Sequence, residues 1–232
     1  MTINWKRLLF VLFWIIVYAI VIYYGIKGFN LSDNIMTTFS FFRLVGLLAF
    51  TTLAFQISTG AFRSILNKIF NPIKLYKFHN VTGGIAFLLA LTHPILFIIA
   101  NYMIKTLDFS YFIPLYITND FYRTALSFGP TALYLLFLSV GAAVLRKKIK
   151  NWIWFHRLNF IIFILVFIHS FNVGTDLAKY AFLKAIWILL FIIVIFGLLY
   201  KIKLMIKNRK RTKVESPISF YTKLLFNELW QK

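Results

Sequence analysis

The chain has 232 residues, of which 61% are apolar and 20% aromatic, whereas only 14% carry a charge. A globular domain usually has about 25% charged residues, so this composition excludes an ordinary soluble fold. Lys and Arg outnumber Asp and Glu by 26 to 6, for a net charge of +20. In a membrane protein this excess is first a topology signal, and we expect no nucleic-acid partner. The chain has no cysteine, which excludes thiolate metal sites, iron–sulfur clusters and a cysteine nucleophile.

Six apolar runs are long enough to cross about 30 Å of hydrocarbon. They cover residues 8–24, 38–57, 80–103, 127–145, 152–172 and 181–204. Lipid offers the backbone no hydrogen-bond partner, so runs of this length are helices. The sequence therefore predicts an all-α membrane protein. We expect a six-helix transmembrane bundle within residues 1–206 and a basic tail over residues 207–232.

The connections between these runs alternate in charge. The segments before the first run, between the second and third, between the fourth and fifth, and after the last carry most of the basic residues. The few basic residues of the opposite connections are balanced by Asp33, Asp108, Asp120 and Asp176. The positive-inside rule then predicts a multi-pass protein of the cell membrane with both termini in the cytoplasm. The basic tail is expected to lie against anionic membrane lipid.

The four histidines of the chain lie near the ends of two runs, His79 and His93 on the third, His156 and His169 on the fifth. An ionisable residue in a span is costly enough to be a functional hypothesis by default. The 14 residues between His79 and His93 span about 21 Å of helix and nearly four whole turns, so both share one face. The 13 residues between His156 and His169 leave them about 140° out of line, so the fifth run needs a π-bulge or another local change of winding.

The third and fifth runs cross in the same direction, which pairs the histidines by depth. His79 should meet His156 at the cytoplasmic level, and His93 should meet His169 at the outer level. Two facing imidazoles at each of two depths can hold two haems through both axial positions. A lone histidine in a span is more often a hydrogen-bonded core residue, but four histidines in two depth-matched pairs favour iron ligation. We therefore expect two b-type haems.

The residues around these histidines also resemble a known family. The matching segments are Leu75-Tyr76-Lys77-Phe78-His79, Gly83-Gly84, Thr92-His93, Trp154-Phe155-His156-Arg157-Leu158 and Ile168-His169. Over residues 38–204 the chain resembles the ferric reductase-like transmembrane domain. That superfamily includes the NADPH oxidases, the ferric-chelate reductases and the haem-binding membrane subunit of the bacterial methionine sulfoxide reductase system. The resemblance implies two b-type haems in a six-helix core that passes electrons from a cytoplasmic flavin to an external acceptor.

The chain also departs from this family. NADPH oxidases continue into a flavin- and nicotinamide-binding module, but no Gly-rich dinucleotide loop follows the last run here. We therefore expect an oxidoreductase component whose flavin is supplied by a separate cytoplasmic flavin reductase. Phe97 stands where those oxidases have a further histidine, so superoxide production is not expected. The identity of the external acceptor stays open.

Several basic residues are candidates for supporting roles. Arg43 lies near the outer end of the second run, where it would either adjoin the outer haem or snorkel to the interface. Lys77 and Arg157 adjoin the cytoplasmic histidines and are candidate ligands for haem propionates, although positive-inside topology alone would place basic residues there. Gly83 and Gly84 would let a porphyrin edge approach the backbone, or serve helix contacts.

Two other functions fit the same histidines. A transporter that hands on a divalent metal or haem would need acidic or clustered ligands along its path, and the runs contain no acidic residue. A non-catalytic haem-binding subunit would have the same ligands as an electron carrier, so the sequence leaves that alternative open.

Overall fold

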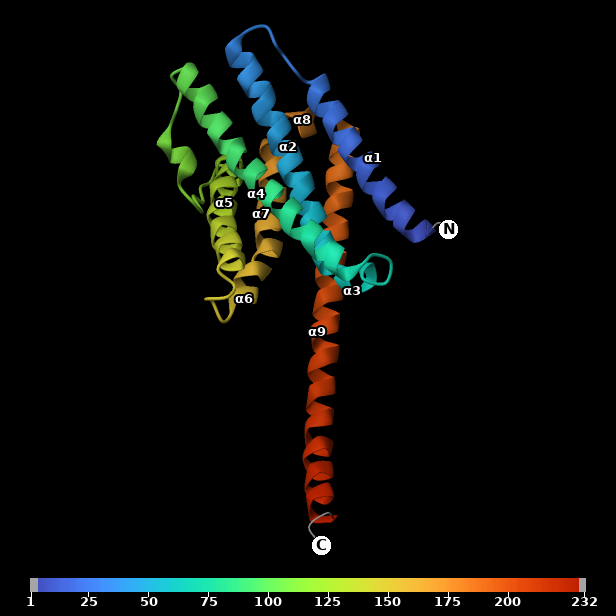
Figure 1. Ribbon diagram of the computed structural model, residues 1–232. Helices are drawn as coiled ribbons and strands as arrows, with labels where there is room; N and C mark the ends of the chain where they lie inside the picture. The colour runs from blue at the N-terminus through green and yellow to red at the C-terminus, as the bar shows by residue number, and fades with distance from the viewer. Residues whose placement is uncertain (1–3, 230–232) are drawn as a thin grey trace.

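The computed structural model describes the backbone of residues 4–229 and the side chains of residues 4–208, and within this part every regular element is a helix (Figure 1). Six helices are long and apolar enough to cross a membrane. They are α1 (Trp5–Lys27), α2 (Asn34–Ala61), α4 (Pro72–Met103), α5 (Phe121–Val144), the consecutive pair α6 (Trp152–Arg157) and α7 (Asn159–Val173), and α9 (Ala181–Leu229). The short elements are α3 (Arg63–Leu66), η1 (Phe109–Phe112) and α8 (Thr175–Lys179). The prediction of an all-α chain with six such helices is confirmed.

Side-chain caps define where several helices begin. The side chain of Asp33 accepts a hydrogen bond from the Met36 backbone N–H at 2.7 Å, and Asn71 caps α4 in the same way. These caps pair N–H groups that have no partner within the helix. Because Asn71 is followed by a proline at the first helical position, α4 begins at Pro72, earlier than the apolar run at residue 80 suggested. His79 therefore lies inside a regular helix instead of at its edge.

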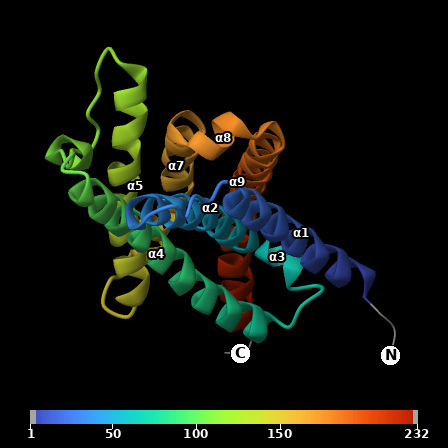
Figure 2. The ribbon, with the colours of Figure 1, turned by 90° about the horizontal axis from the view of Figure 1, so that it is seen from above.

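The bundle is built from two closely packed helix pairs, α2 with α4 and α5 with α7. Seen from above in Figure 2, α2 lies between α1 and α4, and α7 lies between α5 and α9. A stack of buried aromatic rings joins α2, α7 and α9: the Phe50 ring centroid lies 4.6 Å from that of Trp187 and 5.1 Å from that of Phe163. This packing sets the pair α2 and α4 opposite the pair α5 and α7.

The fifth span is interrupted at Leu158, between α6 and α7. The Leu158 N–H bonds the Phe155 carbonyl at 3.0 Å, three residues back, as in a 3₁₀ turn. A 3₁₀ turn has about 3.0 residues, against 3.6 in an α-helix, so it adds rotation between His156 and His169 and moves them toward alignment. The expected change of winding is therefore a local tightening, and the described residues of this span contain no π-bulge.

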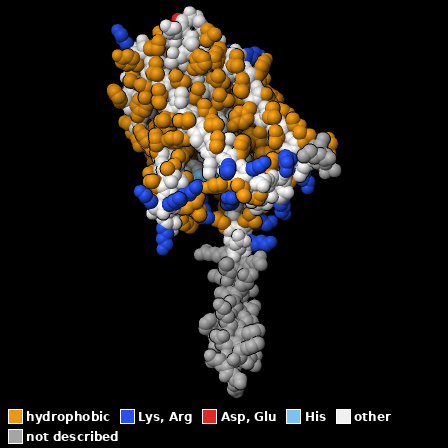
Figure 3. Space-filling view, in the orientation of Figure 1, with side chains coloured by type: hydrophobic (Ala, Val, Ile, Leu, Met, Phe, Trp, Pro, Cys, Tyr) orange, Lys and Arg blue, Asp and Glu red, His pale blue; other side chains and the backbone are white. Residues whose placement is uncertain are grey.

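The surface of the bundle separates side chains by type. On the face seen in Figure 3, hydrophobic side chains cover the side of the bundle, and most of the Lys and Arg gather at the end from which α9 projects. We call this the basic end and the opposite one the far end. The predicted tail over residues 207–232 continues α9 as far as Leu229, and its side chains beyond Asn208 lie outside the described residues.

Candidate cofactor-binding cavity

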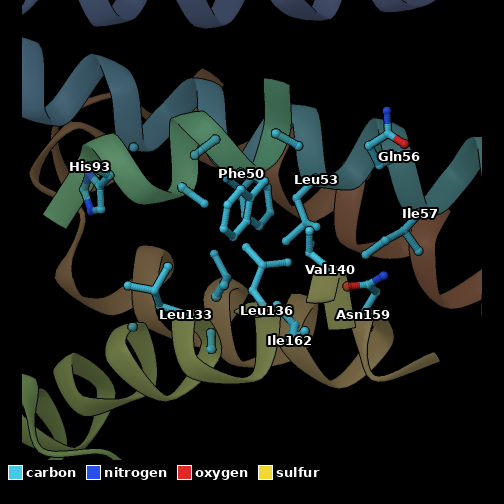
Figure 4. Close-up of a pocket in the computed structure, with 18 of the residues that line it drawn as sticks. Phe50, Leu53, Gln56, Ile57, His93, Leu133, Leu136, Val140, Asn159 and Ile162 are labelled. Carbon is cyan, nitrogen blue, oxygen red and sulfur yellow. The ribbon is translucent and has the colours of Figure 1, made fainter. Parts of the chain in front are cut away.

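A cavity of about 1410 Å³ runs between α2 and α4 on one side and α5, α6 and α7 on the other. Pockets for a single small ligand usually measure about 300–1,000 Å³, so this one has room for more. Figure 4 shows His93 toward one end and Gln56 and Asn159 toward the other. The stretch between them is apolar and is lined by Phe50, Leu53, Leu133, Leu136, Val140 and Ile162. All four histidines line the same cavity.

His79 of α4 and His156 of α6 form the basic-end pair. Their ring centroids are 6.3 Å apart and their planes are 80° to one another. A metal ion bonded to an imidazole nitrogen on each side, at about 2.0 Å, places the ring centres on the order of 6 Å apart. The described residues contain no cluster of three or more His, Cys, Asp or Glu that could hold a metal ion. The pair therefore fits an ion whose other ligands come from a non-protein group, as the four nitrogens of a porphyrin do.

His93 of α4 and His169 of α7 form the far-end pair. The Nδ1 of His93 lies 3.1 Å from the Phe42 carbonyl oxygen, and the Nδ1 of His169 lies 3.2 Å from the Ala125 carbonyl oxygen. A carbonyl oxygen can only accept, so each Nδ1 carries the proton and each Nε2 keeps its lone pair. Metal-ligating histidines almost always donate their other ring N–H in this way. The donor set of this pair thus fits axial ligation of haem iron.

Glycines on the neighbouring helices make room for these rings. A Cβ atom at Gly46 would lie 2.7 Å from Cε1 of His93, and one at Gly129 would lie 2.9 Å from Cε1 of His169. Gly60 faces His79 more loosely, with the corresponding distance at 3.6 Å. Sequence reasoning missed these three glycines. One signal was present, because Gly46 and Gly60 are 14 residues apart, as His79 and His93 are on the adjacent helix.

The glycines that the sequence analysis did single out lie in the same cavity but approach no imidazole. A Cβ atom at Gly83 would first meet the Gln56 side chain at 3.6 Å, and one at Gly84 would meet nothing within 4 Å. Both residues line the cavity. The space beside them remains available to a planar ligand.

Four basic residues from separate elements line the basic end of the cavity: Arg63, Arg146, Arg157 and Lys201. The only carboxylate among the described lining residues is Asp176, which is at the far end. Arg146 hydrogen-bonds the Tyr76 hydroxyl, and the Arg63 guanidinium carbon lies 5.7 Å from the Tyr76 ring centroid. Lys77 is exposed and is not part of the lining, whereas Arg157 is. The basic end therefore offers a site for carboxylate or phosphate groups. The sequence had not indicated that Arg63, Arg146 and Lys201 line the cavity.

At the far end Arg43 pairs with a buried carboxylate. Its Nε lies 3.0 Å from Asp176 Oδ2, and its Nη2 donates to the Gly28 carbonyl oxygen at 2.6 Å. The Asp176 side chain is only 5% exposed, and this burial raises the pKa of its carboxyl group, while the nearby Arg43 acts in the opposite direction. Arg43 lines the cavity, and these bonds use two of its five N–H groups. Sequence reasoning had treated Asp176 as a charge of an outer connection and missed this pairing.

No known protein family, curated protein or solved structure matches this chain. The fold and the cavity define only a class, namely an all-helical chain with six helices long and apolar enough to cross a membrane, which enclose two histidine pairs.

Proposed function

We propose that this chain is a transmembrane electron-transfer protein of the ferric reductase-like kind. It holds one b-type haem between His79 and His156 on the cytoplasmic side and one between His93 and His169 on the outer side. Its electrons come from a cytoplasmic reduced flavin, supplied by a separate flavin reductase, and go to an external acceptor. The observation that carries the proposal is the presence of two histidine pairs, at two depths, in one apolar cavity.

The residues of the chain bind and orient the cofactors and exclude water. Bound haem would supply reversible one-electron chemistry. The carbonyl oxygens of Phe42 and Ala125 fix the ring orientation of the far-end histidines. Apolar side chains such as Phe50 and Leu53 exclude water from the stretch between the pairs. Charge-assisted hydrogen bonds from the basic lining residues, Arg157 among them, would neutralise propionate carboxylates.

The charge distribution supports a cytoplasmic position for the basic end. Lys and Arg cluster there, at the end from which α9 projects (Figure 3). The positive-inside rule assigns such an end to the cytoplasm, and it places both termini there in a multi-pass protein of the cell membrane. The same positive surface would attract an acidic reductase or the phosphate of a flavin nucleotide.

The main alternative is a metal or haem transporter. A path for divalent metal ions needs carboxylates, and the single one in the described cavity lining, Asp176, is already paired with Arg43. This pairing favours electron transfer. A non-catalytic haem-binding subunit would have the same site, so only a measurement of turnover separates it from an electron carrier.

The test is an oxidised and a reduced absorption spectrum of the detergent-purified protein, made with adequate haem supply, with haem quantified per chain. We expect two b-type haems per chain, reduced anaerobically by a flavin reductase with free flavin. The reduction should slow as salt rises, because exposed charges are screened beyond about 8 Å at physiological ionic strength. Protein without haem would overturn the proposal, and a bound transition metal in its place would support the transporter. Bound haem that reduced flavin cannot reduce would support the non-catalytic subunit.

A further inference from the structure

The two histidine pairs differ in what faces their Nδ1 atoms. At the far end each imidazole packs on a short backbone motif of the neighbouring helix, in which a carbonyl accepts from Nδ1 and a glycine follows four residues later. On α2 the motif is Phe42 with Gly46, and on α5 it is Ala125 with Gly129. Because glycine has no side chain, the imidazole ring can approach the backbone of the neighbouring helix. Both far-end rings are therefore held by fixed acceptors.

Fourteen residues further along the same two helices, the equivalent positions are Gln56 with Gly60 on α2 and Ser139 with Ala143 on α5. Here side-chain amides stand beside the imidazoles. The Gln56 amide lies against His79. On the other side Asn159 lies beside His156 and accepts a hydrogen bond from Ser139 Oγ at 3.0 Å.

The orientation of these amides decides which imidazole nitrogen carries the proton. With its nitrogen toward His79, the Gln56 amide donates to the His79 carbonyl oxygen at 3.2 Å, and its oxygen accepts from the Gly83 N–H at 3.0 Å. The reverse orientation loses both bonds, whereas a contact with the Thr82 hydroxyl is present in either orientation. The same amide nitrogen is 2.8 Å from Nδ1 of His79, and the Asn159 Nδ2 is 3.3 Å from Nδ1 of His156.

An amide nitrogen only donates, so in these orientations both basic-end Nδ1 atoms accept. The Thr59 hydroxyl, which donates to the Gln56 backbone carbonyl, is 3.4 Å from Nδ1 of His79, and the amide nitrogen at 2.8 Å is the closer partner. A neutral imidazole carries one proton, which then sits on Nε2. In this form Nε2 has no lone pair for a metal. The far-end pair has the opposite tautomer, because its Nδ1 atoms face carbonyl oxygens.

We propose that, in the haem-free protein, only the far-end pair has the imidazole tautomer that can ligate iron. Gln56 and Asn159 are positioning residues that make the basic-end pair bind haem later and with lower affinity. The inference rests on the proposed function. Ligation at the basic end requires that the proton leave Nε2 and that Nδ1 take one up, so the net charge of the ring is unchanged. The facing amides must also turn over, which gives up hydrogen bonds in the haem-free protein. The loss of one such bond corresponds to about a tenfold weaker affinity.

The first experiment needs no haem. The ¹⁵N chemical shifts of histidine-labelled, haem-free protein in detergent distinguish the two neutral tautomers. We expect the Nδ1–H form for His93 and His169 and the Nε2–H form for His79 and His156. One common tautomer for all four residues would overturn the inference, even in a protein that never binds haem.

The second experiment titrates haem into two variants that each retain one intact pair. His156→Ala retains the far-end pair and His169→Ala retains the basic-end pair. We expect His156→Ala to bind haem more tightly than His169→Ala does, by about tenfold or more. Equal or reversed affinities would contradict the unequal preparation of the two sites. Failure of both variants to bind haem would instead count against the proposed function, and the tautomer measurement would still decide the inference.

The third experiment changes the amide itself. In Gln56→Glu the carboxylate accepts from Nδ1, so His79 should shift to the Nδ1–H tautomer. The haem affinity of the basic-end pair should rise and the midpoint potential of its haem should fall, because the imidazole becomes more basic. If Gln56→Glu folds poorly, Asn159→Asp tests His156 in the same way.

A matched control places the same substitution at another buried amide. The side chain of Asn101 donates to the Phe97 carbonyl oxygen at 2.8 Å and accepts from Thr106, and it is bonded to no histidine in these contacts. Asn101→Asp should leave the His79 tautomer and the affinity of the basic-end pair unchanged. An equal effect of Asn101→Asp and Gln56→Glu would show that added negative charge, and not the contact with His79, is responsible, and would overturn the role of Gln56.

Discussion

Each far-end imidazole is tied to one backbone carbonyl and one glycine, whereas the two basic-end imidazoles lie across from each other at 6.3 Å between ring centroids. The two pairs share one cavity but have separate immediate surroundings. A change at one histidine should therefore affect its own pair first. This independence makes the pairing testable residue by residue.

We expect His79→Ala and His156→Ala each to remove chiefly the cytoplasmic haem, and His93→Ala and His169→Ala each to remove chiefly the outer one. The reason is that loss of one axial ligand leaves the iron of the other pair untouched. Redox titration of the four variants, followed by haem absorbance, measures the two haems separately. A shared phenotype of His79→Ala with His169→Ala would contradict the pairing.

A methyl group beside the far-end rings should weaken haem binding at the far end. In Gly46→Ala and Gly129→Ala the new Cβ atom would lie within 3 Å of an imidazole carbon. Overpacking of this kind costs about 1–3 kcal/mol, so either ring must move away and the occupancy of the outer haem should fall severalfold. Haem content per chain and the reduced spectrum report it. Gly141→Ala is the matched control, since a Cβ atom there meets nothing within 4 Å and Gly141 does not line the cavity, so its haem content should stay normal.

At the scale of the elements, α8 holds neighbouring helices together at the far end of the bundle. It connects α7 to α9, and its Asp176 reaches back to Arg43 on α2. Arg43 also donates to the Gly28 carbonyl just beyond α1, so these contacts link three helices, α1, α2 and α8. Because Asp176 is buried, removal of its cation leaves an uncompensated charge.

Arg43→Gln should therefore destabilise the protein by about 3 kcal/mol at neutral pH. Burial already raises the folded-state pKa of Asp176, and loss of Arg43 raises it further. A carboxyl group with a raised folded-state pKa favours the folded state at low pH, and this stability is lost as the pH rises from about 3.9 through the folded value. The Tm of the variant in detergent should thus fall, relative to the unchanged protein, as the pH rises through that window.

Two further variants check this explanation. Asp176→Asn in the Arg43→Gln background removes the buried charge and should restore much of the lost Tm. Arg123→Gln removes an exposed pair with Asp120, whose atoms are 3.9 Å apart, and should leave Tm unchanged. If the Tm of Arg43→Gln were lowered by the same amount at every pH, the packing of the arginine and not its charge would be what stabilises the protein.

At the scale of the whole molecule, the charge distribution predicts the orientation in the membrane. Lys and Arg gather at the end from which α9 projects (Figure 3). The loop that contains Asn151 lies at this end, next to α6, and the loop that contains Asn119 lies beyond the other end of α5. The positive-inside rule places the first loop in the cytoplasm and the second outside.

The absence of cysteine makes this orientation simple to measure. Both asparagines are exposed, so single cysteines at these positions should be accessible to a thiol reagent. We expect a membrane-impermeant maleimide to label Asn119→Cys in intact cells, and Asn151→Cys only after permeabilisation. The opposite pattern would place the basic end outside the cell and reverse the proposed direction of electron entry.

The sequence by itself determined the helical class, and it predicted the depth of each histidine. Both follow from local physics, because lipid forces an apolar run into a helix and the helical rise converts residue spacing into depth. Helix ends were predicted less well, since α4 begins at Pro72, directly after the cap Asn71, and not at the start of its apolar run. Whether the histidines hold haem stays a prediction.

Only the tertiary structure decided what each side chain faces. It brought Arg63, Arg146 and Lys201 to the cavity while Lys77 remained exposed, and it buried Asp176 against Arg43. It also set Gly46 and Gly129 against the far-end rings, and amides against the basic-end ones. These partners depend on the rotation of each helix about its axis and on residues up to 133 positions apart, as for Arg43 and Asp176. Spacing within one run cannot encode such contacts, because many combinations of helix rotations bury the same apolar faces.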